Sequence, residues 1–337
     1  MRESKIRIGI IGTGAVTQTG HIPAFKSLSK AELIALCDSD KDKLAFLSKK
    51  HRISKVYSDY EKMVSDKAID AVVIASPNNM HLPMIEAACS AKKHILCEKP
   101  LARTAEEASK ICSIVNKSKS KFMLGLNNRF RPDVQILRKF VESELGTVFY
   151  AKTGWLQREG YPEKSSWKSL LESSGGGALL NLGIHLLDEA LWLLGCRKVR
   201  SVVGTAHFLT KKQEVEDSAI ALLNMDDDIM LTIEVSWTLL FDKDFTYFNV
   251  FGDRGSALLK PLKIYKRMHG EIVNVTPRVD AARNAFKISF RLQADHFIKA
   301  LRKGKKPIFQ AEEGLEMAKI IDAIYKSARK KKEIKID

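Results

Sequence analysis

A lysine between an acid and a proline is the first candidate for proton chemistry. Glu98, Lys99 and Pro100 follow a short apolar run, residues 94–97, which predicts a strand. In an open α/β sheet, the carboxyl ends of the strands face the ligand crevice. A lysine there can exchange a proton with a substrate hydroxyl if desolvation or a nearby positive charge lowers its pKa. The alternative is a surface lysine before a turn.

A glycine-rich segment carries the second candidate, a histidine on a predicted helix. Residues 175–177 are three glycines, which allow the backbone to approach a ligand or another strand closely. With a helix beginning shortly after them, about 100° per residue places Asn181, His185 and Asp188 on one narrow stripe. His185 can carry protons near neutral pH, and Asp188, one turn later, can orient it. The alternative is a buried histidine that Asp188 satisfies.

A turn near the amino end predicts a phosphate site. The sequence GTGAVT at residues 12–17 follows the β-prone run 5–11 and opens a helix. Gly12 allows the tight turn, and Gly14 lets the backbone approach a pyrophosphate on the helix N-terminus. The third position of this fingerprint holds Thr17 in place of Gly or Ala.

An acid at the end of the next apolar run predicts the choice of dinucleotide. Asp38 follows the run 32–37 and lies about 20 residues beyond the turn, where a carboxylate accepts hydrogen bonds from a ribose diol. Because a carboxylate also repels a 2′-phosphate, we expect NAD rather than NADP. The alternative role for Asp38 is the N-cap of the following helix.

Short strands and helices alternate through the first part of the chain. Apolar runs predict strands at residues 5–11, 32–37, 71–75, 94–97 and 122–126. Helices are predicted between them at residues 16–28, 40–50, 84–91 and 104–115. Pro23 is expected to kink or end the first part of its helix, and Thr104 to cap the last helix with Glu107. This alternation predicts a parallel, doubly wound sheet.

Longer β-prone stretches with polar turns fill much of the second part. They lie at residues 148–155, 199–209, 218–225, 229–237 and 246–251, after a helix near 132–141. They predict a mainly antiparallel sheet with a few helices, hence an α+β domain. The 337 residues suit two domains. We expect a dinucleotide-binding domain at 1–126 and a substrate-binding and oligomerisation domain at 127–337.

Composition excludes several classes of protein. The chain has 56 Lys and Arg against 40 Asp and Glu, but these cations are scattered and no nucleic-acid motif accompanies them. No uncharged apolar run reaches the roughly 18 residues of a membrane span, and the amino end does not fit a signal peptide. The five cysteines are odd in number and form no Cys-x-x-Cys pair, so reduced, buried thiols are expected. We expect a cytoplasmic protein without a metal ion.

Six stretches together resemble one family. They are GIIGTGAV at 9–16 with the turn above, ASPNNMHLPMIEAACSAKKHILCEKPLARTAEEA at 75–108, NNRFRP at 127–132, SGGGALLNLGIHLLDEALWLLG at 174–195, VEDSAIALL at 215–223 and AEEGLEMAKIIDAIYKSA at 311–328. In this order they resemble the Gfo/Idh/MocA family, which includes glucose–fructose oxidoreductase and inositol dehydrogenase. The resemblance implies a Rossmann domain and a C-terminal α/β domain. The open antiparallel sheet of that second domain usually forms a homodimer or homotetramer interface.

The resemblance also implies an activity and assigns site residues. The activity is NAD(P)-dependent oxidation of a sugar or polyol hydroxyl, or reduction of the corresponding ketone. Lys99 and His185 match the family's catalytic lysine and histidine. Asn181 stands where the family commonly has Asp, and because an amide cannot take a proton, we assign it to substrate binding. The expected cofactor-binding residues are Gly12, Gly14, Ala15, Val16, Asp38, Ser76, Pro77, Asn78, His81, Glu98 and Lys99.

Further residues are candidates for substrate contact. Arg129 and Arg131 can hold an anionic group in a bidentate fork, with an ion pair as the alternative. Trp167, with Trp155 and Tyr161, brackets a polar segment that could cover a sugar, with ordinary packing as the alternative. The net charge of +16 favours an anionic carbohydrate substrate.

Two other functions agree with the same residues. An NAD-dependent glycosidase of the same family would cleave a bond without net NADH. A non-catalytic NAD-binding sensor is favoured by Asn181, but the presence of both Lys99 and His185 argues against it.

Overall fold

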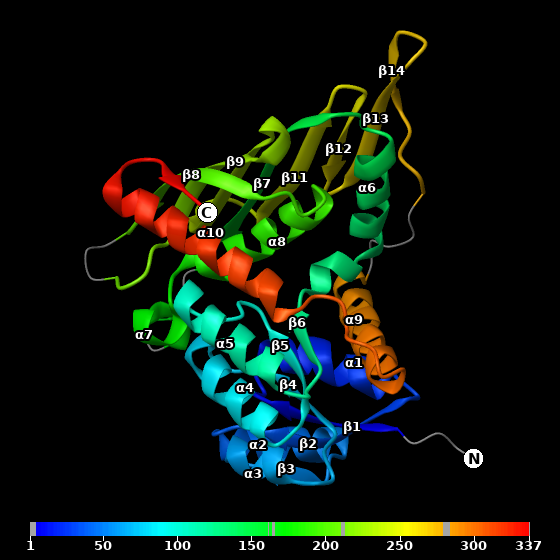
Figure 1. Ribbon diagram of the computed structural model, residues 1–337, viewed down its shortest axis with the longest axis vertical. Helices are drawn as coiled ribbons and strands as arrows, with labels where there is room; N and C mark the ends of the chain where they lie inside the picture. The colour runs from blue at the N-terminus through cyan, green and yellow to red at the C-terminus, as the bar shows by residue number, and fades with distance from the viewer. Residues whose placement is uncertain (1–4, 161, 164–165, 210–212, 279–283, 337) are drawn as a thin grey trace. The chain divides into compact units, whose positions relative to one another are not determined.

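The computed structural model describes residues 5–160, 162–163, 166–209, 213–278 and 284–336 (Figure 1). The chain forms two compact units, which we call unit 1 and unit 2. Unit 1 comprises Met1–Phe130 and Asn284–Glu316, and unit 2 comprises Arg131–Arg283 and Met317–Asp337. Residues 284–316 thus join the unit of the amino-terminal part. The domain division expected between residues 126 and 127 stays a prediction.

Unit 1 contains a six-stranded sheet that positions the candidate residues near its carboxyl edge. The strands are β1 (Ile6–Ile11), β2 (Ala31–Cys37), β3 (Lys55–Tyr57), β4 (Ala71–Ile74), β5 (His94–Glu98) and β6 (Phe122–Gly125). Their order is β3-β2-β1-β4-β5-β6, and every neighbouring pair is parallel. All of β4 is buried, as expected for a continuous apolar run. The prediction of a parallel, doubly wound sheet is confirmed.

Most helices of unit 1 connect these strands, and α9 follows later in the chain. They are α1 (Ile22–Lys26), α2 (Lys41–His51), α3 (Tyr60–Ser65), α4 (His81–Ser90), α5 (Ala105–Lys117) and α9 (Ala285–Arg302), with short turns η1 (Thr17–His21), η2 (Asn78–Met80) and η3 (Asn127–Phe130). Thr104 caps α5 as predicted, since its side chain accepts from the N–H of Glu107. The helix predicted at 16–28 is divided, with the π-helical turn η1 preceding α1, and Pro23 lies in the first turn of α1.

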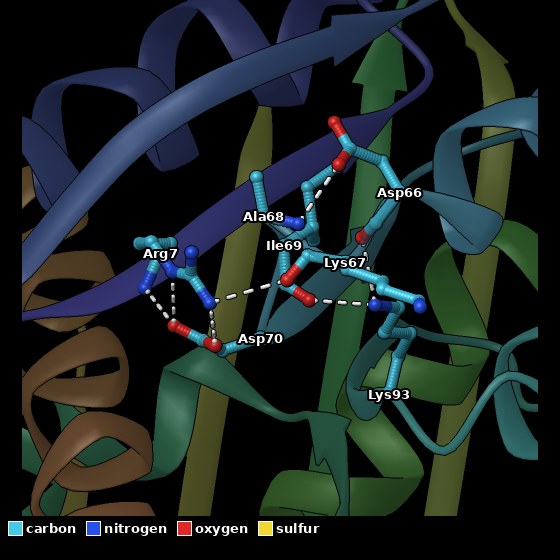
Figure 2. Close-up of polar contacts among 7 residues, drawn as sticks. All are labelled: Arg7, Asp66, Lys67, Ala68, Ile69, Asp70 and Lys93. Atoms are coloured by element: carbon cyan, nitrogen blue, oxygen red, sulfur yellow. Dashed lines mark hydrogen bonds and ion pairs between the residues drawn. The ribbon is translucent and has the colours of Figure 1, made fainter.

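A polar cluster at the amino edge of this sheet joins β1 to the loop before β4 (Figure 2). The Arg7 guanidinium donates to both carboxylate oxygens of Asp70, at 3.0 and 2.7 Å. The ammonium group of Lys93 donates to the carbonyls of Asp66 and Ile69, at 2.8 and 2.7 Å. These bonds lie within the chain itself, so this cluster has a structural role.

Unit 2 contains a nine-stranded mixed sheet. The strands are β7 (Val148–Arg158), β8 (Val199–His207), β9 (Ser218–Met225), β10 (Met230–Leu239), β11 (Phe245–Gly252), β12 (Gly255–Leu259), β13 (Leu262–Met268), β14 (Glu271–Asn274) and β15 (Ile334–Lys335). The order is β14-β13-β12-β11-β7-β10-β9-β8-β15. Neighbours are antiparallel apart from the parallel pair β7 and β10. The predicted mainly antiparallel sheet is confirmed.

Helices cover one face of this sheet and leave apolar side chains on the other. The helical segments are α6 (Pro132–Ser143), η4 (Trp167–Ser169), α7 (Leu171–Ser174), η5 (Leu179–Gly183), α8 (Ile184–Leu193), η6 (Asp226–Asp228) and α10 (Ala311–Lys330). Because side chains alternate along a strand, Leu223 and Ile233 face the core while Ile220 and Leu222 are exposed. Four of the five cysteines are buried, as expected, and Cys196 is exposed. Within the described ranges, no helix is long and apolar enough to cross a membrane.

Candidate active site

The first glycine of the phosphate turn is required by the protein itself. Gly12 has a φ of 90°, and its N–H donates to the carbonyl of Cys37 at 2.8 Å. A Cβ at this position would overlap the backbone carbonyl of Ala75. Both the conformation and the crowding therefore exclude a larger residue.

The second glycine of the turn, Gly14, is required neither by its backbone conformation nor by crowding from the chain. Gly14 is exposed, and a Cβ on it would meet no heavy atom within 4 Å. A helical segment begins at the next residue, Ala15. The turn thus leaves open space in front of a helix N-terminus, which is the arrangement that a pyrophosphate needs. These residues fit a dinucleotide.

Thr17, which replaces the Gly or Ala of the dinucleotide-binding fingerprint, stabilises the turn through a buried hydrogen bond. It is fully buried, and its hydroxyl donates to the carbonyl of Gly12 at 2.7 Å. The third position therefore carries a hydroxyl that holds the turn together rather than a small residue.

Asp38 is fixed beside this turn at the end of β2. Its Oδ2 accepts from the N–H and the hydroxyl of Thr13, at 2.7 and 2.5 Å, and its Oδ1 accepts from the N–H of Asp40 at 3.0 Å. Burial opposes its ionisation, but the hydrogen bonds from Thr13 and Asp40 and the charge of Lys43 lower the pKa of Asp38 overall. The N-cap of α2 is Asp40, so the capping alternative for Asp38 is wrong.

His81 connects the loops that follow β4 and β5. The imidazole is buried, with Nδ1 at 2.9 Å from the carbonyl of Pro100 and Nε2 at 3.3 Å from the carbonyl of Ser76. Burial lowers the pKa of His81. A neutral ring has a single N–H, so one of these two carbonyls accepts it. Pro77 and Asn78 lie between these ends of the loop, and Asn78 is buried.

Glu98 and Lys99 lie at the carboxyl end of β5. Glu98 is buried and pairs in register with Gly125 of β6. Its Oε1 lies 2.8 Å from Nε2 of His21, a residue that the sequence analysis did not select. Lys99 is half-buried and joined to Pro100 by a cis peptide bond.

In unit 2, the chain itself fills the space at the three glycines. Gly175 has a φ of 81° and ends α7. A Cβ on Gly176 would overlap the hydroxyl of Tyr325, and one on Gly177 would overlap the backbone carbonyl of Glu216. Of the two interpretations left open above, the structure favours close approach to another part of the chain.

Glu216 holds the start of the helical segment that carries His185. Its carboxylate accepts from the N–H groups of Gly177 and Leu179 and from the hydroxyl of Tyr325, each at 2.9 Å. Burial raises the pKa of Glu216, although these hydrogen bonds oppose the change. The sequence analysis missed Glu216 and Tyr325 as positioning residues. Both residues lie in stretches that carry the family resemblance, 215–223 and 311–328, but nothing local in those stretches indicates that the two side chains meet.

Asn181 and His185 remain accessible on this segment. In residues 181–190, they are the two that are half-buried, whereas the other eight, Asp188 included, are buried. Asn181 lies in the π-helical turn η5 and His185 in the first turn of α8. The His185 ring lies 6.0 Å from the Trp155 ring, at an interplanar angle of 43°. The amide of Asn181 and the imidazole of His185 are therefore the partly accessible polar groups of residues 181–190.

The other substrate candidates have different surroundings. Arg129 is 3% exposed, donates to Glu313 at 2.7 Å and stacks 4.4 Å over the Phe309 ring, which favours the ion-pair alternative. Arg131 forms an ion pair with Asp133. Trp167 is half-buried at the start of η4, and Tyr161 lies outside the described residues.

The candidate residues therefore form one group in each unit. The dinucleotide-binding candidates, Glu98 and Lys99 belong to unit 1, while Asn181 and His185 belong to unit 2. That Lys99 and His185 act on the same substrate stays a prediction.

Comparison with known proteins decides the family. A model described as an oxidoreductase family with an NAD-binding Rossmann fold matches residues 6–126. Its companion, the C-terminal alpha/beta domain of the same family, matches residues 138–336. The chain belongs to the Gfo/Idh/MocA oxidoreductase family. It is an NAD(P)-dependent oxidoreductase, and NAD as the cofactor is confirmed.

Several relatives extend over nearly the whole chain. D-glucoside 3-dehydrogenase of Escherichia coli (strain K12) is 30% identical over 97% of each chain. Myo-inositol 2-dehydrogenase of Thermotoga maritima is 26% identical over 98% of this chain and 99% of its own. A solved structure of levoglucosan dehydrogenase in complex with NADH and L-sorbose aligns with a TM-score of 0.89 at 22% identity, over 99% of this chain and 100% of that chain. This structural similarity shows the fold.

Proposed function

We propose that this oxidoreductase transfers a hydride between nicotinamide and a hydroxyl-bearing carbon of a sugar or polyol, with Lys99 and His185 exchanging the hydroxyl proton. The observation that carries the proposal is the pair of polar groups in each unit. Lys99 follows Glu98 at the carboxyl edge of a sheet that has an open phosphate turn, and Asn181 and His185 are accessible in a buried helical segment. The relatives named above are dehydrogenases of glucosides and inositol.

Each residue has a separate task in this reaction. Bound NAD supplies the hydride acceptor. The Lys99 ammonium or amine exchanges a proton with the reacting hydroxyl, and the His185 imidazole provides a second proton carrier. Asn181 donates and accepts hydrogen bonds but takes no proton, so it holds a substrate hydroxyl.

The test is NADH formation, followed by absorbance, against a panel of sugars, polyols, sugar acids and nucleotide sugars. We expect Lys99→Ala to lower turnover at least tenfold, while the Kd for NADH changes less than about threefold, because one acid–base group typically contributes about 10²–10⁴-fold. Lys110→Ala, at an exposed position of α5, is the matched control. Unchanged turnover in Lys99→Ala would remove Lys99 from its role.

We also infer a preference for NAD over NADP. The ionised Asp38 carboxylate lies beside the phosphate turn, where it would accept from a ribose hydroxyl and repel a 2′-phosphate. A relative of Haloferax volcanii is named as an NADP(+) enzyme, so the same panel is run with both cofactors. Equal kcat/KM values for the two would contradict this inference.

Three further properties complete the proposal. Exposed Val203, Ile220, Leu222 and Met230 on the outer face of the unit 2 sheet support a homo-oligomer, which the molar mass in solution tests.

Reduced, buried thiols support a cytoplasmic location, which cell fractionation tests. The net charge of +16 supports an anionic carbohydrate, and activity on neutral polyols alone would contradict it.

A further inference from the structure

A buried hydrogen bond connects the helical turn after the phosphate turn to the end of β5, the strand that immediately precedes Lys99. His21 is 1% exposed, and its Nε2 lies 2.8 Å from Oε1 of Glu98. The two residues are 77 positions apart in the sequence, and both belong to unit 1. Since a carboxylate only accepts, the imidazole N–H is the donor of this bond.

The π-helical turn η1 brings His21 to this position. His21 is the last residue of η1, and this turn is tied to the phosphate turn because the Thr17 hydroxyl donates to the Gly12 carbonyl at 2.7 Å. Such π-helical insertions are rare and frequently occur at functional sites. A single chain of contacts therefore runs from the pyrophosphate turn through η1 to Glu98.

Aromatic packing fixes the imidazole ring. The rings of His21 and Phe290 pack edge to face, with centroids 5.0 Å apart and an interplanar angle of 87°. The Phe25 ring also stacks with the His21 ring, with centroids 6.4 Å apart and an interplanar angle of 23°. Gly20 permits this packing, since a Cβ there would lie 2.8 Å from the Phe290 ring. The ring has little freedom to follow Glu98 if that side chain moves.

Glu98 is confined from the sheet side as well. A Cβ on Gly125, the register partner of Glu98, would lie 3.1 Å from Oε1. The space above Gly125 is thus occupied by the Glu98 carboxylate. Held by His21 at Oε1, Glu98 has one defined orientation at the residue immediately before Lys99.

We propose that His21 is a positioning residue that acts through Glu98 to orient the Glu98–Lys99 end of β5 for hydride transfer. This inference rests on the proposed function of Lys99. We expect its effect on turnover, because the residues that would hold the adenosine end of the cofactor, Asp38 and the phosphate turn, lie elsewhere in unit 1. Loss of the His21 bond leaves a buried carboxylate without this donor, so Glu98 adopts other orientations.

The experiment compares His21→Leu, His21→Gln and Glu98→Gln with the wild-type enzyme on the best substrate of the panel. We expect His21→Leu to lower kcat at least tenfold, with changes below about threefold in the Kd for NADH measured by fluorescence. His21→Gln, whose amide can still donate, should recover at least a third of the wild-type kcat. His94→Gln is the matched control, because His94 is a hydrogen-bonded histidine at the opposite, amino end of β5.

A double-mutant cycle separates positioning from general stability. If His21 acts through Glu98, the combined His21→Leu and Glu98→Gln variant should be no slower than the worse single variant. Multiplicative losses, or a kcat for His21→Leu within twofold of wild type, would overturn the inference. If His21→Leu fails to fold, His21→Ala, which also removes the N–H donor, replaces it in both comparisons with the same expectations.

The two proposals fail in different ways. A wild-type enzyme that binds NADH but oxidises nothing in the panel contradicts the proposed function. In that case the emission spectrum of bound NADH still tests the positioning inference. It should differ between wild type and His21→Leu at equal saturation, and an unchanged spectrum would overturn the inference.

Discussion

Two glycine-rich turns precede the π-helical turns η1 and η5, yet their glycines are required for different reasons. At the first turn, Gly14 faces open space, and a Cβ there would meet no atom within 4 Å. At the second turn, Gly176 and Gly177 lie against Tyr325 and Glu216, and a Cβ on either would overlap them. The first turn is therefore built for a ligand, and the second is built for the chain's own packing.

The acids beside the two turns differ in the same way. Asp38 binds the first turn through Thr13, and its pKa is lowered. Glu216 binds the second turn through the N–H groups of Gly177 and Leu179, and burial raises its pKa. A glycine motif alone thus does not indicate a binding site; the atoms that surround it decide.

The largest effect is expected at Gly177. Gly177→Ala places a Cβ on the backbone carbonyl of Glu216, and because both are backbone positions neither can move aside cheaply. We expect a loss of about 3 kcal/mol or more in the free energy of unfolding. Urea denaturation measures this loss. A midpoint equal to that of the wild type would show that the second turn is open like the first.

An intermediate effect is expected at Gly14, and on binding rather than stability. In Gly14→Ala the methyl group occupies the space in front of the helix N-terminus, so the Kd for NADH should rise about tenfold, or about 1.4 kcal/mol. The free energy of unfolding without cofactor should change by less than about 0.5 kcal/mol, as for a surface substitution. NADH titration and urea denaturation of the same variant measure both. Unchanged affinity would contradict the assignment of this turn to the pyrophosphate.

The sequence predicted the elements whose patterns are local. The apolar runs of β1, β2, β4, β5 and β6 marked buried parallel strands, and Thr104 marked the start of α5. It missed β3 and α3, which are short and largely half-buried or exposed, and β12 to β14, which approach the open edge of the second sheet. These segments have weak hydrophobic periodicity because only part of each is covered.

The missed parts of the site depend on contacts between distant residues. His21 reaches Glu98 across 77 positions, and Tyr325 reaches Glu216 across 109. A single sequence carries no local signal for such pairs. The π-helical turns η1 and η5 also follow from tertiary packing, since each sequence reads as an ordinary helix. Sequence reasoning therefore identified the candidate groups but not the residues that hold them.

The smallest effect is a difference in the pH dependence of stability at the two acids. The pKa of Glu216 is raised in the folded protein, so the folded state binds a proton that the unfolded state has released. The stability contributed by Glu216 is therefore present below its ordinary pKa of about 4.3 and is lost as the pH rises through the raised value. The pKa of Asp38 is lowered, so its contribution is present above about 3.9 and is lost as the pH falls.

Two matched variants measure this difference. In Glu216→Gln, the loss of stability as the pH rises above about 4.3 should be smaller than in the wild type, because the titrating group is gone. In Asp38→Asn, the loss of stability on acidification below about pH 4 should be smaller instead. Urea denaturation across this pH range, without cofactor, separates the two cases. The Glu216 carboxylate accepts from Gly177, Leu179 and Tyr325 of the chain itself. Added NAD should therefore leave the pH dependence of stability that Glu216 contributes unchanged. If NAD abolished the pH dependence of stability that Glu216 contributes, the second turn would also respond to the ligand. The comparison between the two turns would then no longer hold.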